Sequence, residues 1–248
     1  MRPETGGVGQ PACIGIDGCR GGWVWCGRLD GRWQGGVVTR LEQLEPLEQI
    51  DLALIDMPIG LIEQGDDERR CDREARALLG RPRASSVFRP PCRGALEALD
   101  YAQACELNRA HTGVALSKQT WNISPKIREL DRLLAARRGL RTRLREAHPE
   151  LCLWALAGGQ PMQHSKRTHR GRQERLTLLS ALDHDAIEMI GSLERAYVRR
   201  VLAVDDIVDA AVLALTALAS MQVAPRCLPS EPQLDATGLP MQLLFVQC

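Results

Sequence analysis

Two aspartates stand where short apolar runs of the sequence end. Asp17 closes ACIGID and is surrounded by glycines in the stretch GIDGCRGGWVW (15–25), and Asp56 closes LALID (52–56). A carboxylate at the end of a buried element is costly unless it is paired or coordinates a metal ion. Both residues are therefore candidate catalytic groups and candidate metal ligands.

A third acidic group opens the apolar segment VDDIVDAAVLALTALAS (204–220). Its apolar residues recur with helical spacing, so the segment predicts a long amphipathic helix. At 100° per residue, Asp209 lies about 40° from Asp205 and about 60° from Asp206 around such a helix. Asp209 can therefore face a site together with either of its neighbours.

Clustered carboxylate oxygens suit Mg²⁺ or Mn²⁺. Two such ions, roughly 3.5–4 Å apart, activate a water molecule and stabilise the leaving oxygen of a phosphodiester. Each aspartate also has an ordinary structural interpretation. Asp17 and Asp56 are compatible with simple turns, and Asp205 or Asp206 with a helix N-cap. The coincidence of three such features favours a metal site.

The elements that would position these acids predict an α/β fold. Three apolar runs separated by glycine turns predict a strand meander over 12–17, 23–29 and 32–38. A short helix is expected over 39–50, and the uninterrupted apolar run at 52–60 is typical of a central strand covered on both faces. In a sheet ordered 3-2-1-4, Asp17 and Asp56 would lie at adjacent strand ends, about 4.8 Å apart.

The middle of the chain predicts a basic helical insertion over about 64–140. Later segments predict a poor strand over 142–150 and helices ahead of the acidic one. We expect a single domain over 12–220, a flexible tail over 1–11 and a C-terminal extension over 221–248 that ends in a strand. The further helices are expected at 67–80, 95–110, 125–139, 151–158, 173–182 and 185–200.

Composition narrows the functional classes. The net charge is +1, which by itself indicates no particular partner. Only three of the 32 basic residues are lysines, and two explanations fit this high arginine content: phosphate recognition by guanidinium groups, or a bias in the genome. The nine cysteines form no CxxC pair, which argues against a standard zinc site, and the odd count points to reduced thiols. No secretory signal or membrane-spanning run is evident, so we expect a cytoplasmic protein with no membrane partner.

Several stretches together resemble the family of predicted RNase H-like nucleases, long carried as a domain of unknown function. They are GIDGCRGGWVW, IDMPIGL (55–61), RRCDREARALLGRPRASSVF (69–88), LSKQTWNISPKIRELD (116–131), EAHPELCLWAL (146–156) and DDIVDAAVLA (205–214). The resemblance covers about residues 12–220. It implies an RNase H-like mixed sheet of five strands, ordered 3-2-1-4-5, with strand 2 antiparallel, helices on its faces, and the helical insertion between strands 4 and 5.

The resemblance also implies roles for individual acids. Asp17 resembles the first-strand aspartate of that fold, and Asp56 resembles the acid that ends strand four. Asp206 and Asp209 are similar to the acidic pair on the terminal helix of the resolvase branch. Either Glu150 or Glu146 would add a ligand from the region of the fifth strand.

Four further residues are candidates for substrate binding. Arg20 lies in the first glycine turn. Lys118 and Trp121 place a cation close in sequence to an aromatic ring that can stack on a base. Lys166 opens a basic segment (166–175) suited to backbone phosphates. The sequence thus predicts a divalent-metal-dependent nuclease. The alternatives are an actin-like or sugar-kinase-type phosphotransferase or ATPase on the same fold, and a non-catalytic nucleic-acid-binding module.

Overall fold

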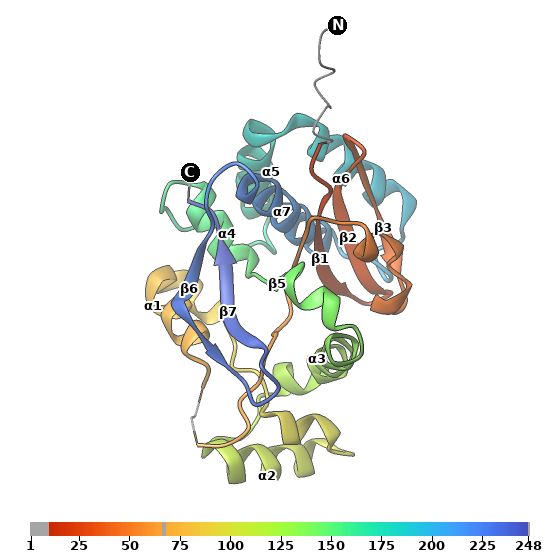
Figure 1. Ribbon diagram of the computed structural model, residues 1–248. Helices are drawn as coiled ribbons and strands as arrows, with labels where there is room; N and C mark the ends of the chain where they lie inside the picture. The colour runs from red at the N-terminus through yellow and green to blue at the C-terminus, as the bar shows by residue number, and fades with distance from the viewer. Residues whose placement is uncertain (1–9, 66–67, 248) are drawn as a thin grey trace, which may run out of the picture.

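A five-stranded mixed sheet forms the centre of the molecule (Figure 1). The computed structural model describes residues 10–65 and 68–247; most of the expected flexible tail lies outside these ranges. The strand order is β3-β2-β1-β4-β5, with β2 antiparallel to both neighbours and β4 parallel to β1 and β5, so the predicted order is confirmed. The strands are β1 (Cys13–Cys19), β2 (Gly22–Leu29), β3 (Arg32–Val38), β4 (Leu52–Ile55) and β5 (Leu144–Glu146).

Helices cover the sheet and fill the connection between β4 and β5. Three of them lie in that connection, as predicted, and four follow β5. Their bounds are α1 (Arg70–Arg83), α2 (Tyr101–Thr112), α3 (Lys118–Ala136), α4 (Pro149–Leu156), α5 (His169–Leu182), α6 (His184–Ala196) and α7 (Val204–Ser220). The bounds of α7 are those predicted from its apolar periodicity.

Several local predictions were wrong. Residues 39–50 form two short 3-10 helices, Leu41–Gln43 and Glu45–Glu48, with Pro46 restricting the second. The strand expected over 142–150 is confined to β5, because α4 begins at Pro149. The helix expected from 125 begins at Lys118, where the Ser117 hydroxyl accepts a hydrogen bond from the Thr120 N–H and caps it.

One face of the sheet is covered by α7, which packs against β1, β2 and β4. Side chains alternate along a strand, so the odd-numbered residues of β1 face this helix. At Gly15, a Cβ atom would lie 2.0 Å from the Ala210 carbonyl oxygen and 2.4 Å from the Ala214 nitrogen. Glycine at this position therefore lets the helix backbone rest directly on the strand.

The opposite face of the sheet packs against α3. Ile14 and Ile16 of β1 belong to a buried cluster that includes Ile127 and Leu130 of α3. The sheet is therefore buried on both faces, as the unbroken apolar run of β4 predicted. Two-sided burial also explains why a polar residue at the end of β1 or β4 has little access to water.

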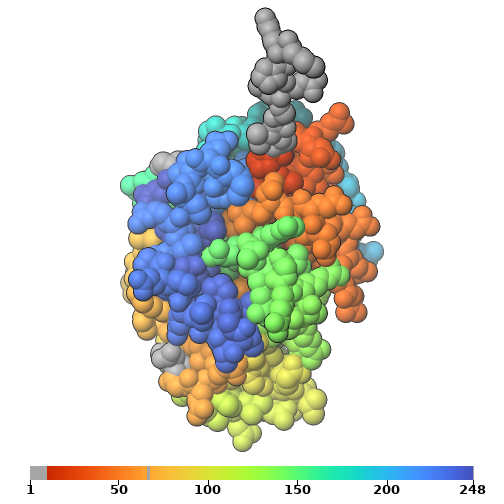
Figure 2. Space-filling model, viewed as in Figure 1, coloured from red at the N-terminus to blue at the C-terminus, as the bar shows by residue number. Residues whose placement is uncertain are grey.

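The C-terminal extension forms a hairpin of β6 (Arg226–Leu234) and β7 (Pro240–Phe245). The hairpin packs against α1, α4 and β5, and Figure 2 shows it (blue) beside the end of the helical insertion (green). The Arg141 guanidinium donates a 3.1 Å hydrogen bond to the Thr237 carbonyl across this contact. The extension thus carries more structure than the single strand expected from the sequence.

Two further observations bear on the sequence-based expectations. Within the described ranges, every helix is too short or too polar to traverse a lipid bilayer. The eight cysteines in the described part of the chain are free thiols, six of them buried. Burial raises the pKa of Cys13 and Cys152 to about 12, which makes these two thiols inert core residues.

Candidate metal centre

Three carboxylates converge at the carboxyl ends of β1 and β4. Asp17, Asp56 and Asp209 each offer an oxygen, and these oxygens all lie within 4.8 Å of one another. Asp17 and Asp209 are 8% and 2% exposed. Three elements far apart in the sequence supply this group, which we call the acidic cluster.

Backbone register and helix packing explain the convergence. Ile16 of β1 pairs with Ile55 of β4, and the Asp56 N–H donates a 3.0 Å hydrogen bond to the Ile16 carbonyl, so Asp17 and Asp56 follow at the same level of the sheet. Asp209 precedes Ala210, whose carbonyl lies against Gly15. The close approach of α7 to β1 therefore delivers Asp209 to the strand ends.

Asp206 lies three residues before Asp209 on α7 and stays outside the 4.8 Å group. It is nevertheless close enough for its charge to raise the pKa of Asp17. The pKa of Asp206 itself rises to about 6, through burial first and the neighbouring Asp205 second. Asp206 thus contributes to the potential of the site from its border.

Burial and mutual repulsion make the acidic cluster costly to ionise. The pKa of Asp17 is held well above its usual range, first by burial and then by the charges of Asp56 and Asp209. Burial also raises the pKa of Asp56 to about 6, against the opposing influence of His148. Burial raises the pKa of Asp209 as well. Such a group favours a bound cation.

Lys166 supplies a cation to the cluster from the loop before α5. Its Nζ lies 2.5 Å from Asp209 Oδ2. Burial lowers the pKa of Lys166, but the charge of Asp209 more than offsets this and the net pKa is raised. Predicted as a phosphate ligand, Lys166 here neutralises a carboxylate, and a metal ion on Asp209 would share that oxygen with it or displace it.

A second lysine near the strand ends was missed by sequence reasoning. Lys126 of α3 donates from Nζ to the Gly22 carbonyl and lies 4.6 Å from the centre of the Trp23 ring. Its stem passes Gly18, where a Cβ atom would lie 2.8 Å from Lys126 Cδ. Gly15 thus makes room for α7 and Gly18 for this lysine. The one sequence feature that could have drawn attention to Lys126 is that lysine is rare in this chain, which has only three.

The other predicted substrate-binding residues lie elsewhere. Arg20 is exposed in the turn between β1 and β2. Lys118 Nζ lies 3.6 Å above the centre of the Tyr101 ring, and the Trp121 ring lies 6.2 Å from it, so both residues pack within the helical insertion. Gln119, between them, lines a pocket that contains Asp56.

The two glutamates near β5 have different environments. Glu146 accepts two hydrogen bonds from the buried Arg69 guanidinium, at 2.6 and 2.8 Å, and one of 2.7 Å from the Ile59 N–H. Burial raises its pKa to about 7, against the influence of Arg69. Arg69 also binds Asp72, so Glu146 belongs to a buried ion-pair network, apart from the acidic cluster.

Glu150 lies nearer to the acidic cluster. One of its oxygens pairs with Arg175. The other, Oε2, lies 3.9 Å from Arg83 Nε but is buried without a hydrogen-bond partner. It lines the same pocket as Asp56 and Asp209, and its charge raises the pKa of both. An unsatisfied buried carboxylate oxygen beside three others is a ready site for a cation or a water molecule.

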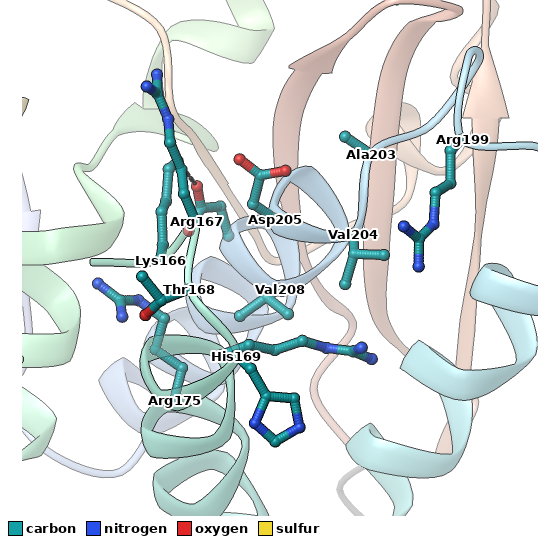
Figure 3. A pocket seen from close by; sticks show the side chains of 12 residues that line it. Lys166, Arg167, Thr168, His169, Arg175, Arg199, Ala203, Val204, Asp205 and Val208 are labelled. Atoms are coloured by element: carbon teal, nitrogen blue, oxygen red, sulfur yellow. Dashed lines mark hydrogen bonds and ion pairs between the residues drawn. The ribbon is translucent and has the colours of Figure 1, made fainter. Parts of the chain in front are cut away.

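Two pockets meet at the acidic cluster. One, of about 500 Å³, lies between α5 and the start of α7, and we call it the basic pocket (Figure 3). The other, of about 340 Å³, contains Asp56, and both pockets include Lys166, Arg167 and Asp209. The cationic or imidazole side chains that line the basic pocket are Lys166, Arg167, His169, Arg172, Arg175 and Arg199.

Fold and site together define a protein of the α/β class with the RNase H-like strand order 3-2-1-4-5 and a buried carboxylate cluster that can hold a metal ion. The chain belongs to the family described as "Protein of unknown function (DUF429)", which it matches over residues 15–234. No curated protein matches the chain significantly. No solved structure does so either.

Proposed function

We propose that this protein is a divalent-metal-dependent nuclease that hydrolyses phosphodiester bonds of nucleic acid at the acidic cluster. The observation that carries the proposal is the convergence of Asp17, Asp56 and Asp209, with oxygens within 4.8 Å of one another, beside an arginine-lined pocket. The carboxylates can bind a metal cation, and the neighbouring arginines can bind an anion. This combination matches a phosphate ester together with its metal ion.

The donor set fits Mg²⁺ or Mn²⁺. All three cluster residues offer hard carboxylate oxygens, with no sulfur or imidazole among them. Glu150 Oε2, which accepts no hydrogen bond, adds an oxygen in the adjoining pocket, and Asp206 borders the site. One or two such ions, once bound, would supply an activated water molecule and stabilise the departing oxygen.

The residues of the chain itself would hold and orient the substrate. The two pockets share Lys166, Arg167 and Asp209, so a strand that crosses from one to the other presents a phosphate at the cluster. Arg83 and Gln119 line the Asp56 side and can contact backbone or base, and Phe88 there offers a ring for stacking. Because a pocket lies on each side of the acidic cluster, the site favours a polymeric substrate over a small phosphate ester.

The test is cleavage of labelled single- and double-stranded RNA and DNA with Mg²⁺ or Mn²⁺. The wild type should cut at least one substrate, and Asp17→Asn should lose cutting while it remains folded by circular dichroism. Asp185→Asn, at an exposed position in the first turn of α6, is the matched control and should cut normally. Equal cleavage by Asp17→Asn and the wild type would refute the proposal.

The two alternatives predict different results in the same experiments. A phosphotransferase or ATPase on this fold would consume ATP and leave every nucleic acid intact. A binding module would retain nucleic acids whatever the metal and cut none. Either result would replace the nuclease assignment.

A further inference from the structure

The basic pocket carries more positively charged side chains than its ion pairs neutralise. Three of its cations are paired with carboxylates: Lys166 with Asp209, Arg175 with Glu150, and Arg172 with Glu194. Asp205 is a further acidic residue on its lining.

Two further guanidinium groups line this pocket, those of Arg167 and Arg199. Both residues are exposed, and within the described part of the chain neither makes an ion pair. Figure 3 shows them on opposite sides of the pocket. Two free guanidinium groups at opposite ends of one pocket make its potential positive across its width, which favours an anion inside it.

Buried donors at the same pocket also lack partners. The Nε of Arg175 is buried and makes no hydrogen bond, and Arg175 is 1% exposed. The Nε of Arg172 is likewise buried and unpartnered. Because these Nε atoms have almost no accessible surface, a ligand does not reach them directly. An N–H left without an acceptor adds local positive potential, which favours an anion in the pocket beside it.

Two helix N-termini open onto the basic pocket. Thr168 and His169 begin α5, where the Thr168 hydroxyl already accepts a 3.1 Å hydrogen bond from the Gly171 N–H, and Ala203 and Val204 begin α7. Ala203 cannot cap α7 with its side chain, so the capping residue itself leaves the first-turn N–H groups uncovered. Helix N-termini carry partial positive charge and favour phosphate groups.

We infer that the basic pocket binds the terminal phosphate monoester of a nucleic-acid strand. This inference rests on the proposed function, because it places the strand end next to the cluster where the strand would be cut. A monoester carries about −1.5 to −2 charges at neutral pH, against −1 for an internal diester. Two free guanidinium groups, the N-terminus of α7 without a side-chain cap, and unpartnered N–H groups beside the pocket give a positive potential that matches the more highly charged end better.

The experiment measures binding without cleavage. Fluorescence anisotropy in EDTA compares one oligonucleotide sequence with a 5′-phosphate, with a 3′-phosphate and with hydroxyl groups at both ends. One phosphorylated form should bind about tenfold more tightly than the hydroxyl form, as expected for charge-assisted hydrogen bonds. Inorganic phosphate in millimolar excess should abolish the difference.

Matched variants locate the effect. The double variant Arg167→Gln/Arg199→Gln should lose the preference for the phosphorylated end. The double variant Arg170→Gln/Arg200→Gln removes two exposed arginines, three residues and one residue further along the chain, that do not line the pocket, and it should keep the preference. Comparing the two pairs cancels the general loss of electrostatic attraction.

Two results would overturn the inference. One is equal binding of all three oligonucleotides, even if inorganic phosphate binds alone. The other is an end preference that survives in Arg167→Gln/Arg199→Gln. A protein that cleaves nucleic acid without an end preference would refute this inference and leave the nuclease proposal standing, whereas an end preference without cleavage would refute the nuclease proposal.

Discussion

The carbonyl oxygen of Ala210 lies so close to Gly15 that a Cβ atom there would come within 2.0 Å of it. This contact sets the distance between α7 and β1. Asp17 follows Gly15 by two residues, on the same face of the strand, and Asp209 immediately precedes Ala210. The geometry of the acidic cluster therefore depends on a glycine that has no chemical role.

Gly15→Ala should destabilise the protein and weaken metal binding together. The added methyl group meets backbone atoms of α7, which cannot move aside as a side chain does. Overpacking of this kind costs about 1–3 kcal/mol or more. Urea denaturation measures the loss. Gly139→Ala is the control, since a Cβ atom at Gly139 meets nothing within 4 Å. Equal stability of the two variants would contradict this account.

Lys166→Gln should have opposite effects on the metal-free and the metal-bound protein. Without the ammonium group, the buried Asp209 loses its partner at 2.5 Å, and the metal-free protein should lose about 1 kcal/mol of stability. The loss is this small because Lys166 is partly exposed and solvent screens the pair. Mn²⁺ should bind roughly tenfold more tightly, because the ion no longer competes with the lysine. Calorimetry measures this.

Lys118→Gln is the control for that change, because Lys118 packs on Tyr101 in the helical insertion. It should alter neither quantity. Weaker Mn²⁺ binding by Lys166→Gln would show that Lys166 supports the metal site and does not compete with the ion.

Glu146→Gln should lower stability and spare metal binding. The change removes one of the two carboxylates that pair with the buried Arg69 and leaves the pair with Asp72, so the loss should be smaller than the about 3–5 kcal/mol of a buried charge left without any partner. Urea denaturation should show this loss, while the Mn²⁺ affinity of the folded variant stays that of the wild type. A large loss of affinity at unchanged stability would instead make Glu146 a ligand.

The acidic cluster should make the metal-free protein less stable as the pH rises. The folded pKa of Asp56 is about 6, above the unfolded value near 4. Its contribution is therefore fully present below about pH 4 and is lost as the pH rises through about 6. Asp56→Asn removes this dependence, so its stability relative to the wild type should rise between about pH 4 and pH 6. Denaturation in EDTA across this range measures the difference, with Asp185→Asn as the control. A constant difference would contradict the raised pKa.

Asp17, Asp56 and Asp209 were predictable because each depends on local pattern and a simple sheet order. The apolar runs give the ends of β1 and β4, and helical periodicity gives the face of α7. The contact between α7 and Gly15 joins residues about 195 positions apart in the chain, and no local sequence pattern encodes it.

The cationic partners were not predictable for the same reason. Arg69 reaches Glu146 across 77 positions and Lys166 reaches Asp209 across 43. Lys118 and Trp121 have the composition of a nucleic-acid contact, yet they pack on Tyr101 because the insertion needs a small core of its own. Charge and aromatic content thus do not distinguish a surface that binds nucleic acid from side chains that pack within the insertion.

Isothermal titration of Mn²⁺ into EDTA-treated, dialysed protein at neutral pH tests the acidic cluster most directly. The wild type should bind at least one ion, and Asp17→Asn and Asp209→Asn should each weaken binding by at least about tenfold, since both remove a charged ligand. Asp185→Asn should bind as the wild type does. Absence of Mn²⁺ binding by the wild type, or undiminished binding by both cluster variants, would contradict the assignment of Asp17, Asp56 and Asp209 as a metal centre.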